Sequence, residues 1–246
     1  MPTMYEIYNA HADRYDELVR AEDYQGNLGR FLDDCLDLRG ARVMEAGVGT
    51  GRMTRLYMDR VDSAVCCDRS PHMLEFAERT LVDSTNEPPR LRFIQADNLD
   101  LPLLQAPVDI FLEGWSSGHA VTDCSDLAAV RDTTWVLMDN ARKNLSPGGS
   151  IVFLETLGTN LDDPAIPHAH LAHFYEELEK THRFQRHEIR TDYRFPSNAE
   201  ATRVMGFFFG SEMEASVRAR GTAVIPEWTG AWIRRDGHDA PAASRF

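Results

Sequence analysis

The stretch "ARVMEAGVGTGRMTRL", residues 41–56, decides how this chain folds. It begins with a short apolar run that ends in Glu45, and Gly47, Gly49 and Gly51 follow. A run of this length suits a buried strand, and the residues after the glycines have a helical pattern. Glycines between a strand and a helix let a small molecule lie close against the backbone. The stretch therefore predicts a ligand-binding turn.

The spacing of the glycines narrows the class of ligand. A dinucleotide-binding turn has the pattern G-x-G-x-x-G, but Arg52 stands where the third glycine would be. A P-loop needs Gly-Lys-Ser/Thr after its glycines, and this turn lacks it. Glu45, two residues before the first glycine, would repel a diphosphate but suits a ligand with an ammonium group.

Two further acids lie at the ends of the next two expected strands. Asp68 stands seventeen residues beyond Gly51, where a carboxylate can accept both hydroxyls of a ribose. Asp97, in "QADNLDLP" (residues 95–102), can accept from the exocyclic amine of an adenine. Together the acids suit an adenosine with a cationic, amino-acid-like tail in place of phosphates. S-adenosylmethionine has this structure and is the expected cofactor.

Strands alternate with helices through the middle of the chain. The expected strands are residues 41–47, 62–68, 90–97, 108–114 and 150–158, and the expected helices are residues 50–59, 70–81 and 126–145. Such alternation predicts an α/β fold with a doubly wound, mostly parallel sheet and right-handed crossovers.

The flanking regions have a different pattern. We expect residues 1–40 to form an N-terminal helical cap and residues 41–158 to form the cofactor-binding core. Residues 159–235 are expected to complete the sheet with strands near 183–195 and 222–235, separated by helical lid insertions. The tail, residues 236–246, is expected to be disordered.

Composition excludes several classes of partner. The chain has 246 residues, a formal net charge of −13 and no basic stripe, which argues against a nucleic acid. No apolar run approaches eighteen residues and the N-terminus lacks a signal-peptide pattern, so we expect no membrane association and a cytoplasmic location. None of the four cysteines is in a CxxC pair, and no metal is expected.

Four successive motifs resemble those of class I S-adenosylmethionine-dependent methyltransferases. They are "VMEAGVGTGRMT" (43–54), "CCDRSPHMLEFA" (66–77), "FIQADNLDLP" (93–102) and "NLSPGGSIVFLE" (144–155). The C-terminal third is also similar to a group of bacterial small-molecule methyltransferase-like proteins. The resemblance implies a Rossmann-like seven-stranded sheet of order 3-2-1-4-5-7-6 whose last strand is antiparallel.

The same resemblance implies a set of cofactor-binding residues. Glu45 and the glycines would lie near the methionine end of the cofactor, Asp68 at the ribose, and Asp97 with Asn98 around the adenine. The full expected set is Tyr15, Glu45, Ala46, Gly47, Gly49, Gly51, Asp68, Arg69, Met73, Ala96, Asp97, Asn98, Glu113 and Gly114.

The end of the fourth strand is the expected site of chemistry. Ligands of open α/β sheets lie beyond the carboxyl ends of the strands, which places "IFLEGWSSGHAV" (110–121) near the sulfonium. His119 is a candidate general base, Trp115 could face the cationic sulfur, and Glu113 could hold the cofactor's amino group. Packing for Trp115 and helix capping for His119 are the alternatives.

Residues outside the core are also candidates for the catalytic site. Tyr8, His11 and Tyr15 have the spacing of one helical face, and Tyr15 is expected to line the acceptor pocket. Tyr175 and Arg194 are expected near the mouth of the site, where Arg194 could clamp an acceptor carboxylate.

Three nearby histidines, His168, His170 and His173, are two and three residues apart, and this spacing does not favour a metal site.

These features predict an enzyme of small-molecule metabolism or biosynthesis. It would transfer the methyl group of S-adenosylmethionine to an oxygen, nitrogen or carbon nucleophile of a small substrate. Two alternatives stay open: cyclisation of the cofactor to azetidine-2-carboxylate and methylthioadenosine, and non-catalytic binding of S-adenosylmethionine. A homodimer is compatible with the sequence.

Overall fold

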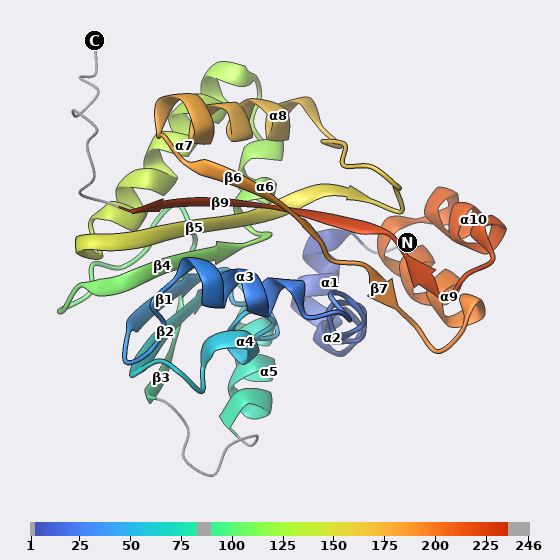
Figure 1. Ribbon diagram of the computed structural model, residues 1–246, viewed down its shortest axis with the longest axis horizontal. Coiled ribbons are helices and arrows are strands. Elements are labelled where there is room, and N and C mark those ends of the chain that lie inside the picture. The colour runs from blue at the N-terminus through green and yellow to red at the C-terminus, as the bar shows by residue number, and fades with distance from the viewer. Residues whose placement is uncertain (1–2, 83–89, 236–246) are drawn as a thin grey trace.

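A twisted sheet with helices on both faces organises the residues that the computed structural model describes, 3–82 and 90–235 (Figure 1). The strands are β1 (Arg42–Ala46), β2 (Ser63–Asp68), β3 (Arg90–Gln95), β4 (Val108–Gly114), β5 (Leu145–Thr159), β6 (Gln185–Arg190), β7 (Tyr193–Arg194), β8 (Val224–Ile225) and β9 (Glu227–Arg235). The helices are α1 (Met4–Ala10), α2 (Ala12–Ala21), α3 (Asn27–Cys35), α4 (Thr54–Tyr57), α5 (Pro71–Val82), α6 (Ser117–Thr122), α7 (Leu127–Arg142), α8 (Ala169–Glu176), α9 (Asn198–Phe209) and α10 (Ser211–Arg220), and a π-helical turn, Glu177–Thr181, follows α8.

The topology of the main sheet confirms the predicted fold class. Its strand order is β3-β2-β1-β4-β5-β9-β6. The pairs from β3 to β5 are parallel, and β9 runs antiparallel between β5 and β6. In chain order β9 is the seventh strand of this sheet, so the arrangement is the expected Rossmann-like 3-2-1-4-5-7-6.

Each face of the sheet has its own hydrophobic core. Successive side chains of a strand point to opposite faces. Val43 therefore lies in one cluster with Leu32 of α3 and Tyr57 of α4. Met44, the next residue, lies in a second cluster with Met138 of α7 and Trp232 of β9.

A third hydrophobic cluster forms a lid at one end of the sheet. It joins Ile7 of α1 and Leu18 of α2 to Phe208 of α9, Val217 of α10 and Ile225 of β8. Segments far apart in sequence thus lie together beside the sheet (Figure 1). The helix α3 packs on the sheet instead, so only the first two helices of the expected cap belong to this lid.

Three expected elements are interrupted in the structure. The N-terminal helix breaks at His11, whose backbone dihedrals are φ −135° and ψ 42°. The strand expected over 183–195 divides into β6 and β7, and the one over 222–235 divides into β8 and β9 at Pro226. Proline has no N–H group for a strand ladder. β7 and β8 pair with each other in a separate two-stranded sheet. The expected tail, 236–246, lies outside the described residues.

Replacement of Trp232 by alanine tests how much the β9 core contributes to stability. The Trp232 ring is fully buried, stacks on Tyr175 at 4.2 Å between ring centroids, and donates from Nε1 to Glu179 at 2.9 Å. We expect Trp232→Ala to lower the free energy of unfolding by about 3–5 kcal/mol, measured by equilibrium urea denaturation. The control Val136→Ala, at a position 42% exposed, should stay within about 0.5 kcal/mol of wild type. Equal effects would contradict this account of the core.

Candidate functional site

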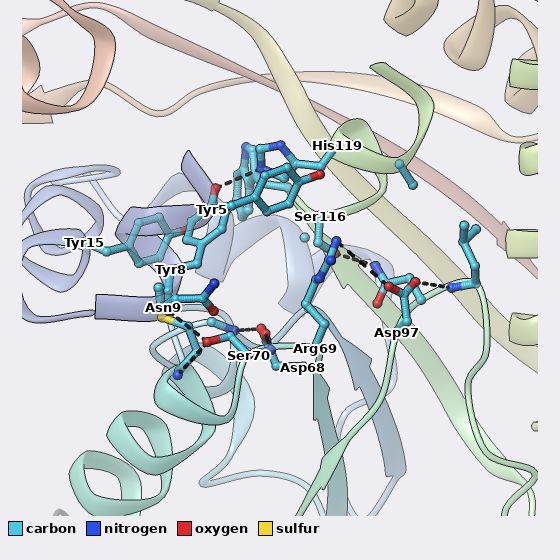
Figure 2. Close-up of a pocket in the computed structure, with 18 of the residues that line it drawn as sticks. Tyr5, Tyr8, Asn9, Tyr15, Asp68, Arg69, Ser70, Asp97, Ser116 and His119 are labelled. Carbon is cyan, nitrogen blue, oxygen red and sulfur yellow. Dashed lines mark hydrogen bonds and ion pairs between the residues drawn. The ribbon is translucent and has the colours of Figure 1, made fainter. Parts of the chain in front are cut away.

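A cavity of about 510 Å³ lies beside the carboxyl ends of β1, β2 and β4, beneath α1 and α2. Most of the expected cofactor residues reach it (Figure 2). Those that line this first cavity are Tyr15, Gly47, Gly49, Asp68, Arg69, Met73, Asp97, Asn98 and Gly114, together with the candidate catalytic residues Trp115 and His119.

The glycine turn after β1 forms the floor of the first cavity. Gly47 has φ +71°, and a Cβ atom built there would lie 2.0 Å from the Ser116 Oγ. Gly49 has φ +54°, and its Cβ would meet the Tyr15 ring at 3.5 Å. Larger residues would clash at Gly47 and are strained at both positions. The turn therefore leaves backbone, and no side chain, facing a ligand.

Asp68, at the end of β2, is fixed by two backbone donors. Its Oδ2 accepts from Gly49 N at 2.8 Å, and its Oδ1 accepts from Ser70 N at 2.8 Å. The residue is buried, and loss of hydration raises the pKa of its carboxyl in spite of these hydrogen bonds. Each carboxylate oxygen can accept more than one hydrogen bond. The group can therefore hold a diol that enters the cavity.

The turn after β3 and residues Arg69 and Tyr5 add polar and planar groups to the first cavity. Asp97 Oδ1 accepts from Leu99 N at 2.9 Å, and Asn98 Nδ2 donates to the Ser116 Oγ at 2.7 Å. The guanidinium of Arg69 lies 5.0 Å from the centroid of the Tyr5 ring. These residues present hydrogen-bonding groups and a stacked cation to a flat heterocycle.

His119 and Tyr8 form a hydrogen-bonded pair in the site. The Tyr8 hydroxyl lies 2.8 Å from the His119 Nε2, and the Tyr8 ring packs edge-on against the Tyr15 ring (Figure 2). Burial lowers the pKa of His119 and raises that of Tyr8. The imidazole is therefore neutral near pH 7 and can accept a proton. His119 is the third residue of α6, so helix capping does not explain it.

Trp115 has an unusual backbone and a charged neighbour. Its φ is +53°, a rare conformation for a residue with a side chain, found most often at functional sites. The Arg52 guanidinium lies 3.7 Å from the centroid of a Trp115 ring and pairs with Glu22 at 2.6 Å. Arg52 thus already covers one face of the indole.

A second cavity, of about 290 Å³, adjoins the first. Four side chains line both cavities and form a shared wall: Tyr8, Tyr15, Trp115 and His119. The second cavity extends toward the lid helix α9 and toward the start of β9. These four side chains therefore lie between a molecule in one cavity and a molecule in the other.

Several expected site residues lie outside both cavities, and we correct their expected positions. Buried Glu45 accepts from the hydroxyls of Thr54 at 2.7 Å and Tyr57 at 2.5 Å. Glu113 Oε1 accepts from the backbone N–H groups of Ser116 at 2.8 Å and Ser117 at 2.6 Å. Both carboxyls hold the local backbone and helix in place and do not line the cavities.

Two expected catalytic residues also take structural positions. Tyr175 is buried, donates to the Thr156 carbonyl at 2.9 Å and stacks on Trp232. Arg194 is exposed and lies 3.8 Å from the centroid of the Tyr24 ring. The remaining expected residues that line neither cavity are Ala46, Gly51 and Ala96.

Some residues of the first cavity have no counterpart among the expected site residues. Tyr5 is one of them and donates to the carboxylate of Asp123. Ser116, which belongs to the expected stretch 110–121, also lines the cavity and donates to Glu113. Asn9 also lines the cavity, whereas His11 packs edge-on against Phe207 instead. Tyr5 stands three residues before Tyr8, the spacing of one helical face, and this spacing is the sequence signal for it.

The described residues contain neither a metal-binding cluster nor a membrane-spanning helix. Among the described residues, no group of three or more His, Cys, Asp or Glu side chains is placed to hold a metal ion. Within residues 3–82 and 90–235, no helix has the length and apolarity needed to cross a membrane.

The chain is similar to known methyltransferases. Residues 43–149 match a family model described as a methyltransferase domain. An uncharacterized methyltransferase of Oceanobacillus iheyensis is 24% identical over 157 residues, which are 62% of this chain and 66% of that relative, slightly under two thirds of its length.

Solved structures share the fold at low sequence identity. A Haemonchus contortus phosphoethanolamine N-methyltransferase 2, in complex with phosphomonomethylethanolamine and S-adenosylhomocysteine, has a TM-score of 0.58 and 12% identity, covering 93% of this chain and 58% of that one. A complex of DhpI with SAH has a TM-score of 0.52 and 20% identity, covering 94% of each chain. These findings confirm the resemblance to class I S-adenosylmethionine-dependent methyltransferases.

A pH series tests the structural role of Glu45. Burial raises the pKa of Glu45 to about 7, above the value of 4.5 for a free carboxyl. Between these two values the unfolded chain loses the proton while the folded chain keeps it, so this group lowers stability as pH rises from about 4.5 to 7. We expect the free energy of unfolding of Glu45→Gln, taken relative to that of wild type, to rise by roughly 3 kcal/mol across this pH range, measured by urea denaturation. A difference that is constant with pH would contradict the raised pKa.

Proposed function

We propose that this protein is an S-adenosylmethionine-dependent methyltransferase whose acceptor is a small molecule in the second cavity. The observation that carries the proposal is the pair of adjoining cavities with one shared wall, Tyr8, Tyr15, Trp115 and His119. The first cavity offers the groups that the cofactor requires. The second provides a separate space for an acceptor.

The residues of the first cavity fit S-adenosylmethionine. Gly47 lines the first cavity and has no side chain, and the Ser116 side chain takes up the position that a Cβ would fill, so the methionine portion can lie against the backbone of the glycine turn. Asp68 can accept from the ribose hydroxyls, and Asp97 with Asn98 faces the adenine end. The cavity volume of about 510 Å³ lies within the range for a ligand of this size.

S-adenosylmethionine, when bound, supplies an electrophilic methyl carbon on a sulfonium. The chain's own residues then align the acceptor, exclude water and receive a proton where the acceptor carries one. Tyr8 and Tyr15 meet edge to face at 5.5 Å between ring centroids and close the shared wall from the side of the N-terminal helices. Both aromatic rings limit the access of water to the junction of the cavities.

The Tyr8–His119 pair provides the route for the proton. His119 is buried and neutral, with its Nε2 in contact with the Tyr8 hydroxyl at 2.8 Å. An acceptor hydroxyl or ammonium at the shared wall can give its proton to Nε2 directly or through the Tyr8 hydroxyl. This placement supports His119 as the general base.

Incubation with S-adenosylmethionine alone, followed by mass spectrometry, separates the proposal from cyclisation. Methylthioadenosine together with a cyclised amino acid would overturn methyl transfer. Tight binding of an unchanged cofactor, followed by release of S-adenosylhomocysteine when small acids, phenols and amines are screened, supports it. Binding without release for any acceptor would favour a cofactor-binding protein instead. The second cavity supports transfer, because cyclisation needs no second substrate.

Gly47→Ala tests the cofactor cradle. The added Cβ would lie 2.0 Å from the Ser116 Oγ at a φ of +71°, so we expect the affinity for S-adenosylhomocysteine to fall at least about tenfold by calorimetry. Gly40→Ala is the matched control, because Gly40 also has φ +71° but no atom within 4 Å of its Cβ. If both variants bind equally well, S-adenosylhomocysteine does not occupy the cradle.

His119→Gln tests the general base. With any acceptor found in the screen, we expect kcat to fall about 10²-fold or more, while the affinity for S-adenosylhomocysteine changes little. Tyr8→Phe keeps the imidazole but removes its hydrogen bond, and it should lower kcat less. In wild type the rate should decline only below about pH 6.5, because burial lowers the pKa of His119. An unchanged kcat in His119→Gln would exclude this residue as the base.

A further inference from the structure

The second cavity contains more buried acids than buried cations. Glu22, Glu155 and Glu227 line it, and each is less than a tenth exposed. The arginine on its lining is Arg52. Carboxylates are rarely buried unless a cation or hydrogen-bond donors compensate them. The charges of these side chains therefore indicate the kind of ligand that the second cavity can bind.

Glu22 and Arg52 compensate each other. Their side chains pair at 2.6 Å, and the guanidinium also stacks on Trp115 at 3.7 Å. Arg52 is thus fixed on two sides and its charge is matched. An acceptor carboxylate would have to compete with Glu22 for it.

Glu155 and Glu227 have no salt bridge among the described residues. Glu155 Oε1 accepts from Gly118 N at 2.6 Å, beside the shared wall. Glu227 Oε1 accepts from the Thr156 hydroxyl at 3.3 Å, and its buried Oε2 has no hydrogen-bond partner within residues 3–82 and 90–235. Burial raises the pKa of both carboxyls well above the ordinary value. A cation from outside the chain would offset the cost of burying these two carboxylates without a paired cation.

The rest of the lining is apolar and aromatic. It includes Leu18, Leu171, Phe208 and Phe209, along with Tyr8 and Tyr15 of the shared wall. Aromatic faces attract organic cations as well as apolar groups. The lining therefore suits a molecule with a positively charged head and an apolar body.

We propose that the acceptor is a small primary or secondary amine on an apolar body, bound as its ammonium ion by Glu155 and Glu227. This inference rests on the proposed methyltransferase function and assigns its substrate class. In the reaction the ammonium loses one proton to the Tyr8–His119 pair. The freed lone pair on nitrogen forms the new N–C bond, and the C–S bond breaks with its electron pair left on sulfur. The amine gains one methyl group and the cofactor product is S-adenosylhomocysteine.

The structure disfavours an acceptor carboxylate. Arg194, the expected clamp for such a group, lies against Tyr24 and lines neither cavity. Arg52 is paired with Glu22. Burial already opposes the ionisation of Glu155 and Glu227, so a carboxylate beside them would be unfavourable, and an alcohol brings no positive charge to favour their ionised forms.

Binding of matched probes to the protein saturated with S-adenosylhomocysteine tests the inference. The probes are methylamine, benzylamine and 2-phenylethylamine, each compared by calorimetry with the alcohol and the carboxylate of similar shape. We expect at least one amine to bind about tenfold or more tightly than its matched alcohol, and the carboxylates to bind most weakly. If no amine binds more tightly than its alcohol, the inference is wrong.

Two variants that each remove one carboxylate test which residues cause the preference for amines. Glu227→Gln and Glu155→Gln should each weaken amine binding about tenfold and leave the affinity for the matched alcohol within about twofold. Glu188→Gln is the control, because Glu188 lies on the exposed side of β6 and lines neither cavity. Unchanged amine affinity in both cavity variants would overturn the assignment of these acids.

The same titrations separate this inference from the proposed function. Binding of S-adenosylhomocysteine is measured first and also reports whether each variant is folded. Failure of wild type to bind it would sink the methyltransferase proposal itself. Normal binding without any preference for amines would sink only the amine assignment.

Discussion

The approach of Gly47 to Ser116 is the constraint on which the candidate site depends. β1 and β4 are parallel neighbours, with Ala46 opposite Glu113, so the turns that follow them meet at one edge of the sheet. A Cβ at Gly47 would lie 2.0 Å from the Ser116 Oγ, and the turns meet this closely because residue 47 has no side chain. Ser116 then accepts from Asn98, which draws the turn after β3 to the same edge. Three separate turns form one continuous surface for a ligand.

Buried acids around this edge have two different kinds of role. Glu45 and Glu113 accept hydrogen bonds from nearby hydroxyl or backbone groups and keep the local structure in place. Asp68 accepts backbone hydrogen bonds and also reaches the first cavity. Among the described residues, Glu113 and Glu227 each keep one buried carboxyl oxygen with no hydrogen-bond partner. Glu227 differs from Glu113 in that it lines the second cavity, where a ligand can reach it.

The sequence predicted the order of the main sheet for physical reasons, and several of the expected site residues line the first cavity. Alternating strands and helices allow few topologies, so the order of the main sheet followed from the pattern. Asp68 is the last residue of β2 and Asp97 stands two residues after the end of β3, and the carboxyl ends of parallel strands meet at one edge. Glu45 stands within β1, so its side chain points to one face of the sheet, where α4 supplies its partners. The position of Arg194 could not be predicted from the sequence. It lies on β7, which pairs with β8 in a separate small sheet, and no local sequence pattern indicates that pairing.

The two cavities draw on different parts of the chain, with a consequence for how such proteins diverge. Most of the first cavity comes from residues within 43–149, the region that matches the methyltransferase domain family. Tyr193, Phe208, Phe209 and Glu227 of the second cavity come from later segments of the chain. Substitutions in α9 or at the start of β9 can therefore reshape one pocket without altering the backbone of the other. Relatives can inherit the same cofactor cradle and still evolve separate acceptor preferences.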